Sequence, residues 1–291
     1  MNINLSTKAV LVSLNIGIWG ANKMDKQVSN EIADSKKLVD KKMVRAWKSL
    51  LAKNEYYDAI ASIAAKARKF HYENTFSWVS DGQRLLPTAN YDAYMTFMRQ
   101  VQRDFARAVS AFIAHYPTLK EAAESALNSI YKEGDYPSAE SLSQRFYLNT
   151  YTMPVPAGAM FEADVNETDA ERIREDIDKQ VTEAFRAANQ ELWDRMYATI
   201  NRLHARLTNP KGVREQTLKS LREMLGLLDR LNVSGNERLE QLRQQALARI
   251  GSLSAKDLKE SPEEKKATLA AQAKQIEDSM AEFMGDSAHA A

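Results

Sequence analysis

The sequence contains no cysteine, and among its 291 residues it has only 10 glycines and 7 prolines. The absence of cysteine excludes disulfide bonds, thiolate nucleophiles, iron–sulfur clusters and cysteine-ligated zinc sites, and it is typical of a reducing compartment. The scarcity of glycine and proline favours helices over a turn-rich all-β fold. With 44% hydrophobic and 27% charged residues, the chain has the composition of a folded protein with a buried core.

The sequence also lacks a hydrophobic run that could cross a membrane. Its most apolar stretch, residues 9–18, has about half of the ~20 residues that a spanning helix needs. Asn15 and Gly17 interrupt this stretch, and no small-residue cleavage site follows it clearly, so it is not typical of a signal peptide. We therefore expect no membrane partner and a cytoplasmic location.

A strong charge of either sign is missing as well. The formal net charge is +1, which gives no bulk electrostatic reason to expect nucleic acid. The charges are instead arranged in blocks: residues 1–70 carry 13 Lys/Arg against 6 Asp/Glu, residues 136–201 carry 6 against 12, and residues 202–250 carry 10 against 5. Solvated helix faces are the commoner reason for such blocks, and complementary faces within an assembly are the other.

Familiar catalytic and cofactor motifs are absent. The chain has no P-loop, no G-x-G-x-x-G and no G-x-S-x-G, which are the patterns of phosphate binding and of serine nucleophiles. The four histidines, His71, His115, His204 and His289, form no H-x-x-x-H pattern, so we predict packed or capping side chains rather than metal ligands. We predict no catalytic residue, metal, cofactor or small-molecule substrate, and an enzyme with an unfamiliar site is the third hypothesis.

Acidic residues gather in one place, between Asp169 and Asp178. Glu171 and Glu175 are four residues apart, so they share one face of a predicted helix and could bind a divalent cation. The simpler interpretation is that acidic residues near the start of a helix complement the positive end of its dipole. We favour that interpretation.

The first part of the chain, residues 1–160, is predicted to be a mixed α+β domain. Alternating apolar residues indicate a strand over residues 10–18, and Asp81-Gly82 is typical of the turn of a hairpin between residues 76–79 and 84–87. Ser138 is predicted to cap a short helix, which a strand over residues 146–153 follows. Helical spacing, with Pro117 as a stop, predicts helices over residues 35–51, 56–70, 91–116 and 119–131.

The rest of the chain is predicted to be helical, so the expected fold class is α+β and predominantly helical. Residues 161–252 should form long antiparallel helices, either packed as a bundle or projecting as a coiled-coil-like arm. Residues 253–291 should form a C-terminal helix, begun by Ser261-Pro262, and a tail that frays.

The most informative stretch runs over residues 167–207. Apolar residues recur there about every 3.8 positions from Ile173 to Leu207, close to the helical period. A stripe this long needs a partner surface, from its own chain or from another. The predicted partner-binding residues on this stripe are Ile173, Ile177, Val181, Phe185, Leu192, Met196, Ile200 and Leu203.

The helix predicted over residues 35–51 offers a second kind of surface. Basic residues beside exposed aromatics suit single-stranded nucleic acid. Trp47 follows the apolar stripe of this helix, however, so we expect Trp47 in the core and the lysines in solvent. The candidate nucleic-acid contacts are Lys36, Lys37, Lys41, Lys42, Arg45 and Lys48.

Several short segments of the first part occur in a recognisable order and spacing. They are residues 11–19 (LVSLNIGIW), 35–40 (SKKLVD), 82–87 (GQRLLP), 112–116 (FIAHY), 135–138 (DYPS), Phe146 and 153–156 (MPVP). In this order they resemble a phage and bacterial family whose domain has no known function. The genes of that family often lie beside those of a MoxR-type AAA+ ATPase and of a cobalt-chelatase-like protein with a von Willebrand A domain.

The resemblance covers residues 1–165 and, more weakly, the helices that follow. It implies a phage or prophage origin, and hence the host cytoplasm, and it implies an ATPase module as a partner. It transfers no catalytic residue.

Two functions follow as expectations. The first is a non-enzymatic, phage-type interaction or adaptor protein that docks a partner protein, or a second copy of itself, through long amphipathic helices. The partner would belong to a AAA+ ATPase module. The alternative is a nucleic-acid-associated phage protein that uses the basic helix, which salt-dependent retention on DNA would reveal.

Overall fold

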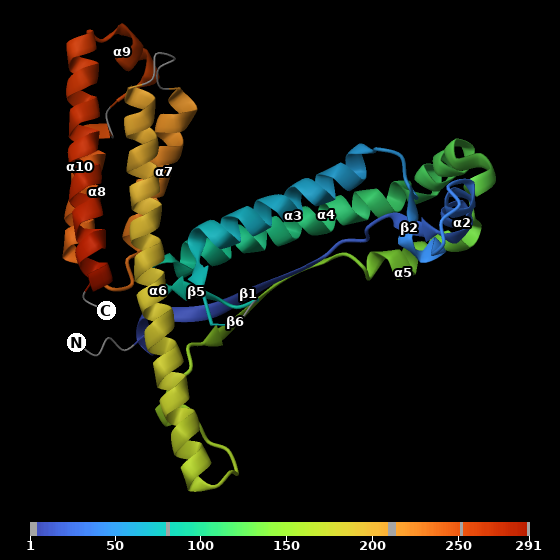
Figure 1. Cartoon of the computed structure of the whole chain (residues 1–291), viewed down its shortest axis with the longest axis horizontal. Helices are drawn as coiled ribbons and strands as arrows, with labels where there is room; N and C mark the ends of the chain where they lie inside the picture. The colour runs from blue at the N-terminus through green and yellow to red at the C-terminus, as the bar shows by residue number, and fades with distance from the viewer. Residues whose placement is uncertain (1–4, 80–81, 209–213, 251–252, 290–291) are drawn as a thin grey trace. The chain divides into compact units, whose positions relative to one another are not determined.

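The computed structural model describes residues 5–79, 82–208, 214–250 and 253–289, which form a predominantly helical α+β fold (Figure 1). Its strands make a four-stranded sheet in the order β4-β5-β1-β6 and a two-stranded sheet of β2 and β3. The elements in chain order are α1 (Leu5–Lys8), β1 (Ala9–Gly17), β2 (Asn22–Asp25), α2 (Lys26–Ser35), η1 (Lys41–Met43), β3 (Ala46–Ser49), α3 (Glu55–Asn74), β4 (Phe76–Ser77), β5 (Arg84–Pro87), α4 (Thr88–Leu127), η2 (Asn128–Ile130), η3 (Glu133–Asp135), α5 (Ala139–Ser143), β6 (Tyr147–Pro154), η4 (Gly158–Met160), α6 (Glu167–Leu207), α7 (Glu215–Leu231), α8 (Glu237–Ile250), α9 (Ala255–Glu260) and α10 (Glu263–His289).

The contacts divide the chain into two compact units that are not consecutive in sequence. The first unit takes residues 1–13, 72–94 and 151–291, and the second takes residues 14–71 and 95–150. This division differs from the sequential boundaries expected at residues 160 and 252. Among the described residues, no helix combines the length and the apolar character that crossing a bilayer requires.

The first unit joins a small antiparallel sheet to a group of helices. The predicted strand and hairpin are confirmed: Ala9 of β1 lies opposite Pro87 of β5, and Phe76 of β4 lies opposite Leu85 of β5. Gly82 adopts φ +92° in the hairpin turn, a left-handed conformation that suits glycine. The buried core of this unit extends from these strands through α6, α7, α8 and α10.

The second unit contains most of α3 and α4, and its core is aromatic. The rings of Phe70 and Phe97 stack with their centroids 3.6 Å apart. The ring of Phe112 is fully buried and lies edge-on to those of Tyr57 and Phe146. Aromatic pairs of this kind stabilise a core beyond their buried area.

The predicted stop at Pro117 is wrong, because α4 continues through Pro117 to Leu127. Proline lacks the backbone N–H that would bond the preceding turn, which weakens the helix. Side chains that pack before and after Pro117 compensate for the missing hydrogen bond. Tyr116 is buried and its hydroxyl donates to the carbonyl of Pro137 at 3.0 Å, and Ala123, about two turns after Tyr116, is buried as well.

The helix predicted over residues 35–51 is also wrong. The structure ends α2 at Ser35 and then forms a loop, the short η1 and strand β3. Strand β3 pairs with β2, with Trp47 opposite Met24. The apolar residues of this segment therefore do not share one helix face: Leu50 and Leu51 are buried, whereas Val39 and Met43 are exposed.

Candidate interaction surfaces

The described part of the chain holds no group of three or more His, Cys, Asp or Glu side chains placed to bind a metal ion. The acidic residues near the start of α6 take part in local structure. Asp169 accepts a hydrogen bond from Arg172 at 2.9 Å, and Asp178 accepts one from the backbone N–H of Gly158 at 2.8 Å.

The histidines have different surroundings. His115 stacks on Tyr56 with ring centroids 4.0 Å apart, His204 lies beside Glu277, and His71 is buried. The side chain of His289 lies outside the described residues.

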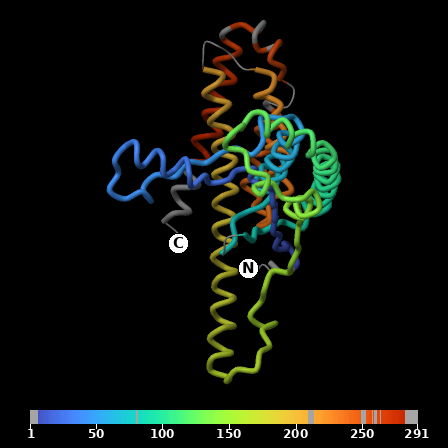
Figure 2. The backbone as a smooth tube through the Cα atoms, turned by 90° about the vertical axis from the view of Figure 1, so that its right-hand side faces the viewer, coloured from blue at the N-terminus to red at the C-terminus, as the bar shows by residue number. Residues whose placement is uncertain are grey.

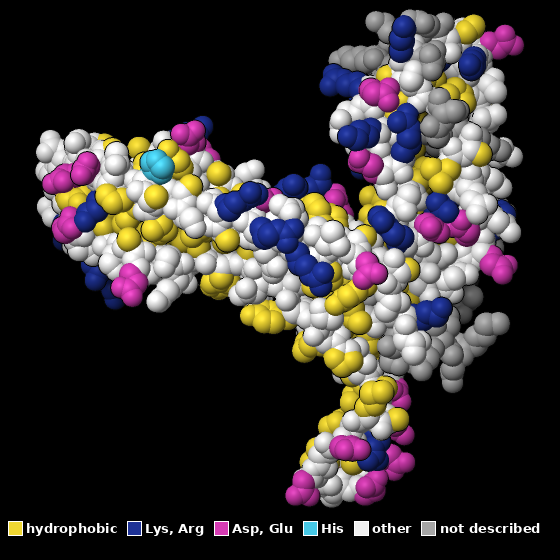
Figure 3. All heavy atoms as spheres, turned by 180° about the vertical axis from the view of Figure 1, so that it is seen from behind, with side chains coloured by type: hydrophobic (Ala, Val, Ile, Leu, Met, Phe, Trp, Pro, Cys, Tyr) yellow, Lys and Arg dark blue, Asp and Glu magenta, His cyan; other side chains and the backbone are white. Residues whose placement is uncertain are grey.

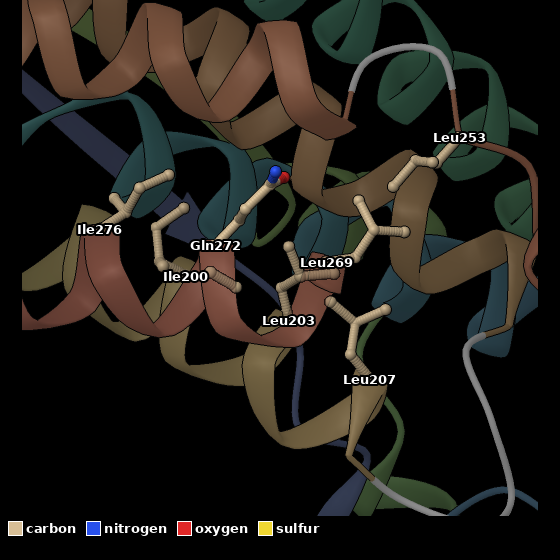
Figure 4. Close-up of a pocket in the computed structure, with 8 residues that line it drawn as sticks. Ile200, Leu203, Leu207, Leu253, Leu269, Gln272 and Ile276 are labelled. Carbon is tan, nitrogen blue, oxygen red and sulfur yellow. The ribbon is translucent and has the colours of Figure 1, made fainter. Parts of the chain in front are cut away.

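A small cavity lies in the first unit (Figure 4). Its volume is about 10 Å³, close to that of one water-sized probe, so it is too small for a small-molecule ligand. Its lining is apolar except for one glutamine and consists of Ile200, Leu203, Leu207, Leu253, Leu269, Gln272, Ala273 and Ile276.

The C-terminal half of the predicted stripe on α6 is covered by the chain itself. Leu192, Met196, Ile200 and Leu203 are all buried, in one hydrophobic cluster with leucines of α7 and α8 and with Ile276 of α10. These four predicted partner-binding residues are internal core in this structure. The surface that a partner could cover is thereby restricted to the N-terminal half of the stripe.

A polar cluster holds α10 against α6 beside that core. Glu277 of α10 is 5% exposed and accepts hydrogen bonds from Asn201 at 3.0 Å and from the Tyr197 hydroxyl at 3.4 Å. Its second carboxylate oxygen lies 3.0 Å from Nδ1 of His204. A buried carboxylate is costly unless it is paired and hydrogen-bonded, so these contacts fix the position of α10 along α6.

The N-terminal half of α6 has a different environment. Val181 and Phe185 pack partly buried at the edge of the hydrophobic cluster, whereas Ile173 and Ile177 are half-buried and lie outside it. The preceding segment, residues 157–166, folds back alongside this half of the helix (Figure 2). We call residues 160–180 the acidic arm.

The acidic arm has a defined local structure. Asn166 caps α6 by accepting a hydrogen bond from the backbone N–H of Asp169 at 2.9 Å. Gly158 is buried, and a Cβ atom on it would lie 2.4 Å from the carbonyl oxygen of Arg174. Only glycine therefore allows the incoming chain to approach the helix this closely.

The surface of the acidic arm combines carboxylates with exposed hydrophobic side chains. It carries eight Asp/Glu against three Lys/Arg, and the side chains of Met160 and Val165 are 70% and 45% exposed. In Figure 3 acidic and hydrophobic side chains gather at the bottom of the view.

Five of the six cations predicted to contact nucleic acid lie on one segment of the second unit, between the end of α2 and the middle of β3. We call residues 36–47 the basic loop. It begins with a Schellman motif that ends α2: the N–H of Lys37 donates to the carbonyl of Asp34 at 3.0 Å, and that of Leu38 to Ala33 at 2.9 Å. Lys37 adopts φ +53°, a left-handed conformation that is strained for residues with a Cβ atom.

Further contacts close the basic loop at its base. The N–H of Ala46 donates to the hydroxyl of Ser29 on α2 at 2.9 Å, and the amine of Lys41 lies 2.6 Å from Asp34. The side chain of Asp40 accepts from the N–H of Lys42 at 2.9 Å and so caps η1. The sequence therefore builds a loop of fixed shape rather than a helix.

The basic loop exposes hydrophobic side chains among its cations. Val39 is fully exposed, and Met43 and Trp47 are 80% and 64% exposed, contrary to the expectation that Trp47 lies in the core. Trp47 and Met24 face each other across β2 and β3. The cations that the structure leaves exposed on the loop are Lys36, Lys37, Lys41, Lys42 and Arg45.

Lys48, the remaining predicted nucleic-acid contact, is buried in an ion-pair cluster. Its amine lies 2.8 Å from Asp135 and 3.7 Å from Asp25, and it donates to the carbonyl of Ile130. The N–H of Val28 is the main reason why the pKa of Asp25 lies below its usual value, and the charge of Lys48 acts in the same direction. Lys48 therefore stabilises the fold and is not available to nucleic acid.

Sequence patterns missed several residues that shape these surfaces. Asp25 directly precedes α2 and accepts from the N–H groups of Gln27 and Val28, and an N-cap rule applied there would have placed the start of this helix. Asp135 has no such local signal, because its partners are distant in sequence, and the same holds for the contacts that Glu277 makes with α6. Arg195 of α6, which donates to the carbonyls of Tyr72, Glu73 and Thr75, is another example.

No family model, curated protein or solved structure matches this chain. The acidic arm and the basic loop are therefore defined by this chain's own residues alone.

Proposed function

We propose that this protein is a non-enzymatic adaptor that docks a partner protein through the acidic arm. The observation that carries the proposal is that the apolar spacing of α6 continues beyond the core that its own helices cover. Ile173 and Ile177 lie outside the hydrophobic cluster, and Met160 and Val165, which belong to the same arm, are exposed. Full burial of an exposed side chain of this size contributes about 1.5–3 kcal/mol, from which the costs of association are subtracted.

The arm fits a known mode of recognition, in which an amphipathic helix lies in a groove of its partner. Its carboxylates favour a partner surface with basic residues around an apolar groove, because complementary charges steer association and set its register. A AAA+ ATPase module, which the sequence resemblance implies, is one partner to test by coexpression.

The test compares two exposed positions of the arm with a matched exposed position elsewhere. Met160→Ser with Val165→Ser removes apolar surface without touching the core, and Val79→Ser makes the same change at a 53% exposed valine outside the arm. Each full-length chain is expressed with an ATPase and a von Willebrand A protein of the kind that the sequence resemblance implies, and the bound fraction is measured. We expect the arm variant to bind about tenfold more weakly or worse, and Val79→Ser to bind like the wild type. Equal binding by all three would disprove docking at the arm.

A second candidate function is binding of single-stranded nucleic acid by the basic loop. The specific observation in its favour is that Trp47 is exposed among five cations, since a base can stack on the indole while the cations contact phosphates. Fluorescence anisotropy with a labelled oligonucleotide tests it at several salt concentrations. Lys42→Gln should lower the salt dependence by about one phosphate contact, whereas Trp47→Ala should weaken binding at every salt concentration.

A further inference from the structure

We propose that the acidic arm of one copy binds the basic loop of a second copy of this chain. The inference rests on the proposed function of the arm as a protein-binding surface, and it names the partner. Each copy offers one arm and one loop, so the copies join either reciprocally into a two-fold dimer or head to tail into a ring or an open row.

Charge is the first observation behind this inference. The basic loop carries five Lys/Arg against the single Asp40, and the acidic arm carries eight Asp/Glu against three Lys/Arg. Surfaces of opposite charge attract each other during encounter and fix the register of the complex. Since salt screens exposed charges, the association should weaken as salt is raised.

The hydrophobic side chains are the second observation. Val39 and Met43 of the loop and Met160 and Val165 of the arm are exposed aliphatic groups, which are stabilised when another protein covers them. Nucleic-acid bases stack on aromatic rings instead, and Trp47 is the single aromatic residue of the loop. The exposed side chains of the basic loop therefore fit a protein partner better than they fit nucleic acid.

Both surfaces are also shaped before any partner binds. The Schellman motif at Lys37 and the cap by Asp40 hold the loop, and the hydrogen bond from Gly158 to Asp178 holds the arm. A preformed surface loses little conformational entropy on binding, so two modest patches can associate measurably.

A charge-swap experiment tests the inference with full-length chains. All six positions are exposed, so the substitutions leave both cores intact. The loop variant carries Lys36→Glu, Lys42→Glu and Arg45→Glu, and the arm variant carries Glu162→Lys, Glu171→Lys and Glu175→Lys. Sedimentation velocity over a range of concentrations, at low and at high salt, measures self-association.

We expect the wild type to associate with rising concentration and to dissociate at high salt. Each variant alone should associate about tenfold more weakly or worse, because its loop and arm then carry the same sign. An equimolar mixture of the two variants should associate again, since opposite signs meet at both junctions, and so should a chain with all six substitutions. This recovery could not occur if the variants failed to fold.

Three results would overturn the inference: a wild type that stays monomeric at every concentration, a variant that associates like the wild type, or a mixture that does not recover. A monomeric wild type that binds a labelled oligonucleotide through the loop would also overturn it and favour nucleic acid. If the wild type is monomeric but Met160→Ser with Val165→Ser abolishes binding of another protein, the second copy is excluded as partner and the proposed function stands.

Discussion

The two halves of α6 carry the same helical spacing of apolar residues in different surroundings. In the C-terminal half, Met196 and Ile200 are buried among the helices of the first unit. In the N-terminal half, Ile173 and Ile177 are half-buried beside a chain segment rich in carboxylates. The comparison teaches that periodicity identifies which side of a helix is covered but not what covers it.

The largest difference in stability should be between two truncations of isoleucine, one in each half of α6. Ile200→Ala should lower the free energy of unfolding by about 2–5 kcal/mol, because it leaves a cavity in a close-packed core. Ile173→Ala should lower it by about 1 kcal/mol or less, since its side chain is already partly in water. Chemical denaturation of both variants measures the difference, and equal losses would show that the arm is as much a part of the core as the C-terminal half.

The next largest difference in stability concerns the polar cluster around Glu277, which lies on the half of α6 that other helices cover. Glu277→Ala should cost about 1–3 kcal/mol, because Asn201 and Tyr197 would lose their shared acceptor in a buried site. Its neighbour Asp278 has a side chain that is 62% exposed, so Asp278→Ala should change stability by less than about 0.5 kcal/mol. Thermal unfolding compares the two, and a loss as small for Glu277 as for Asp278 would mean that the cluster does not fix α10.

A glycine substitution examines the uncovered half in the same way. Gly158→Ala should destabilise the arm by about 1–3 kcal/mol, since the new methyl group would overlap the carbonyl of Arg174. Hydrogen exchange measures this as faster exchange over residues 167–180. Gly226→Ala in α7 is the control: beyond its neighbours and the backbone of its own helix, no atom of the described residues lies within 4 Å of its Cβ position, so it should stabilise the chain by roughly 0.5–1 kcal/mol. Unchanged exchange in Gly158→Ala would show that the incoming segment is not held against the helix.

The smallest change in stability is expected in the basic loop. Lys37→Gly should raise stability by at most about 1 kcal/mol, because relief of the left-handed strain exceeds the added entropy of the unfolded chain. Lys36→Gly makes the same chemical change at φ −91°, where no such strain exists, so it should be neutral or destabilising. Thermal unfolding distinguishes the two variants, and a loss in both would contradict the strain assigned to Lys37.

Much of the fold could be predicted from the sequence. The bounds of α6, the strand β1, the 76–87 hairpin and the short helix capped by Ser138 follow from local patterns of apolar, turn and capping residues. The prediction failed where distant contacts decide. Pairing with β2 makes residues 46–49 a strand, and packing around Tyr116 carries α4 through Pro117.

The candidate surfaces could be predicted only in part. Five of the six cations predicted to contact nucleic acid are exposed, but Lys48 differs from them through Asp25 and Asp135, which no spacing rule links to it. Likewise, spacing alone cannot separate Ile177 from Ile200, because burial depends on which helices fold back along α6.

The continuity of α6 has a mechanical consequence. Its 41 residues contain neither glycine nor proline, so it is a stiff rod of about 60 Å, at 1.5 Å per residue. A partner that pulls on the arm would therefore transmit tension along the rod to the leucine packing at its other end. The contacts of Glu277 with α6 would then resist that tension. A proline introduced in the middle of α6 would interrupt the helix, so that pulling on the arm would no longer unfold the packing at the other end.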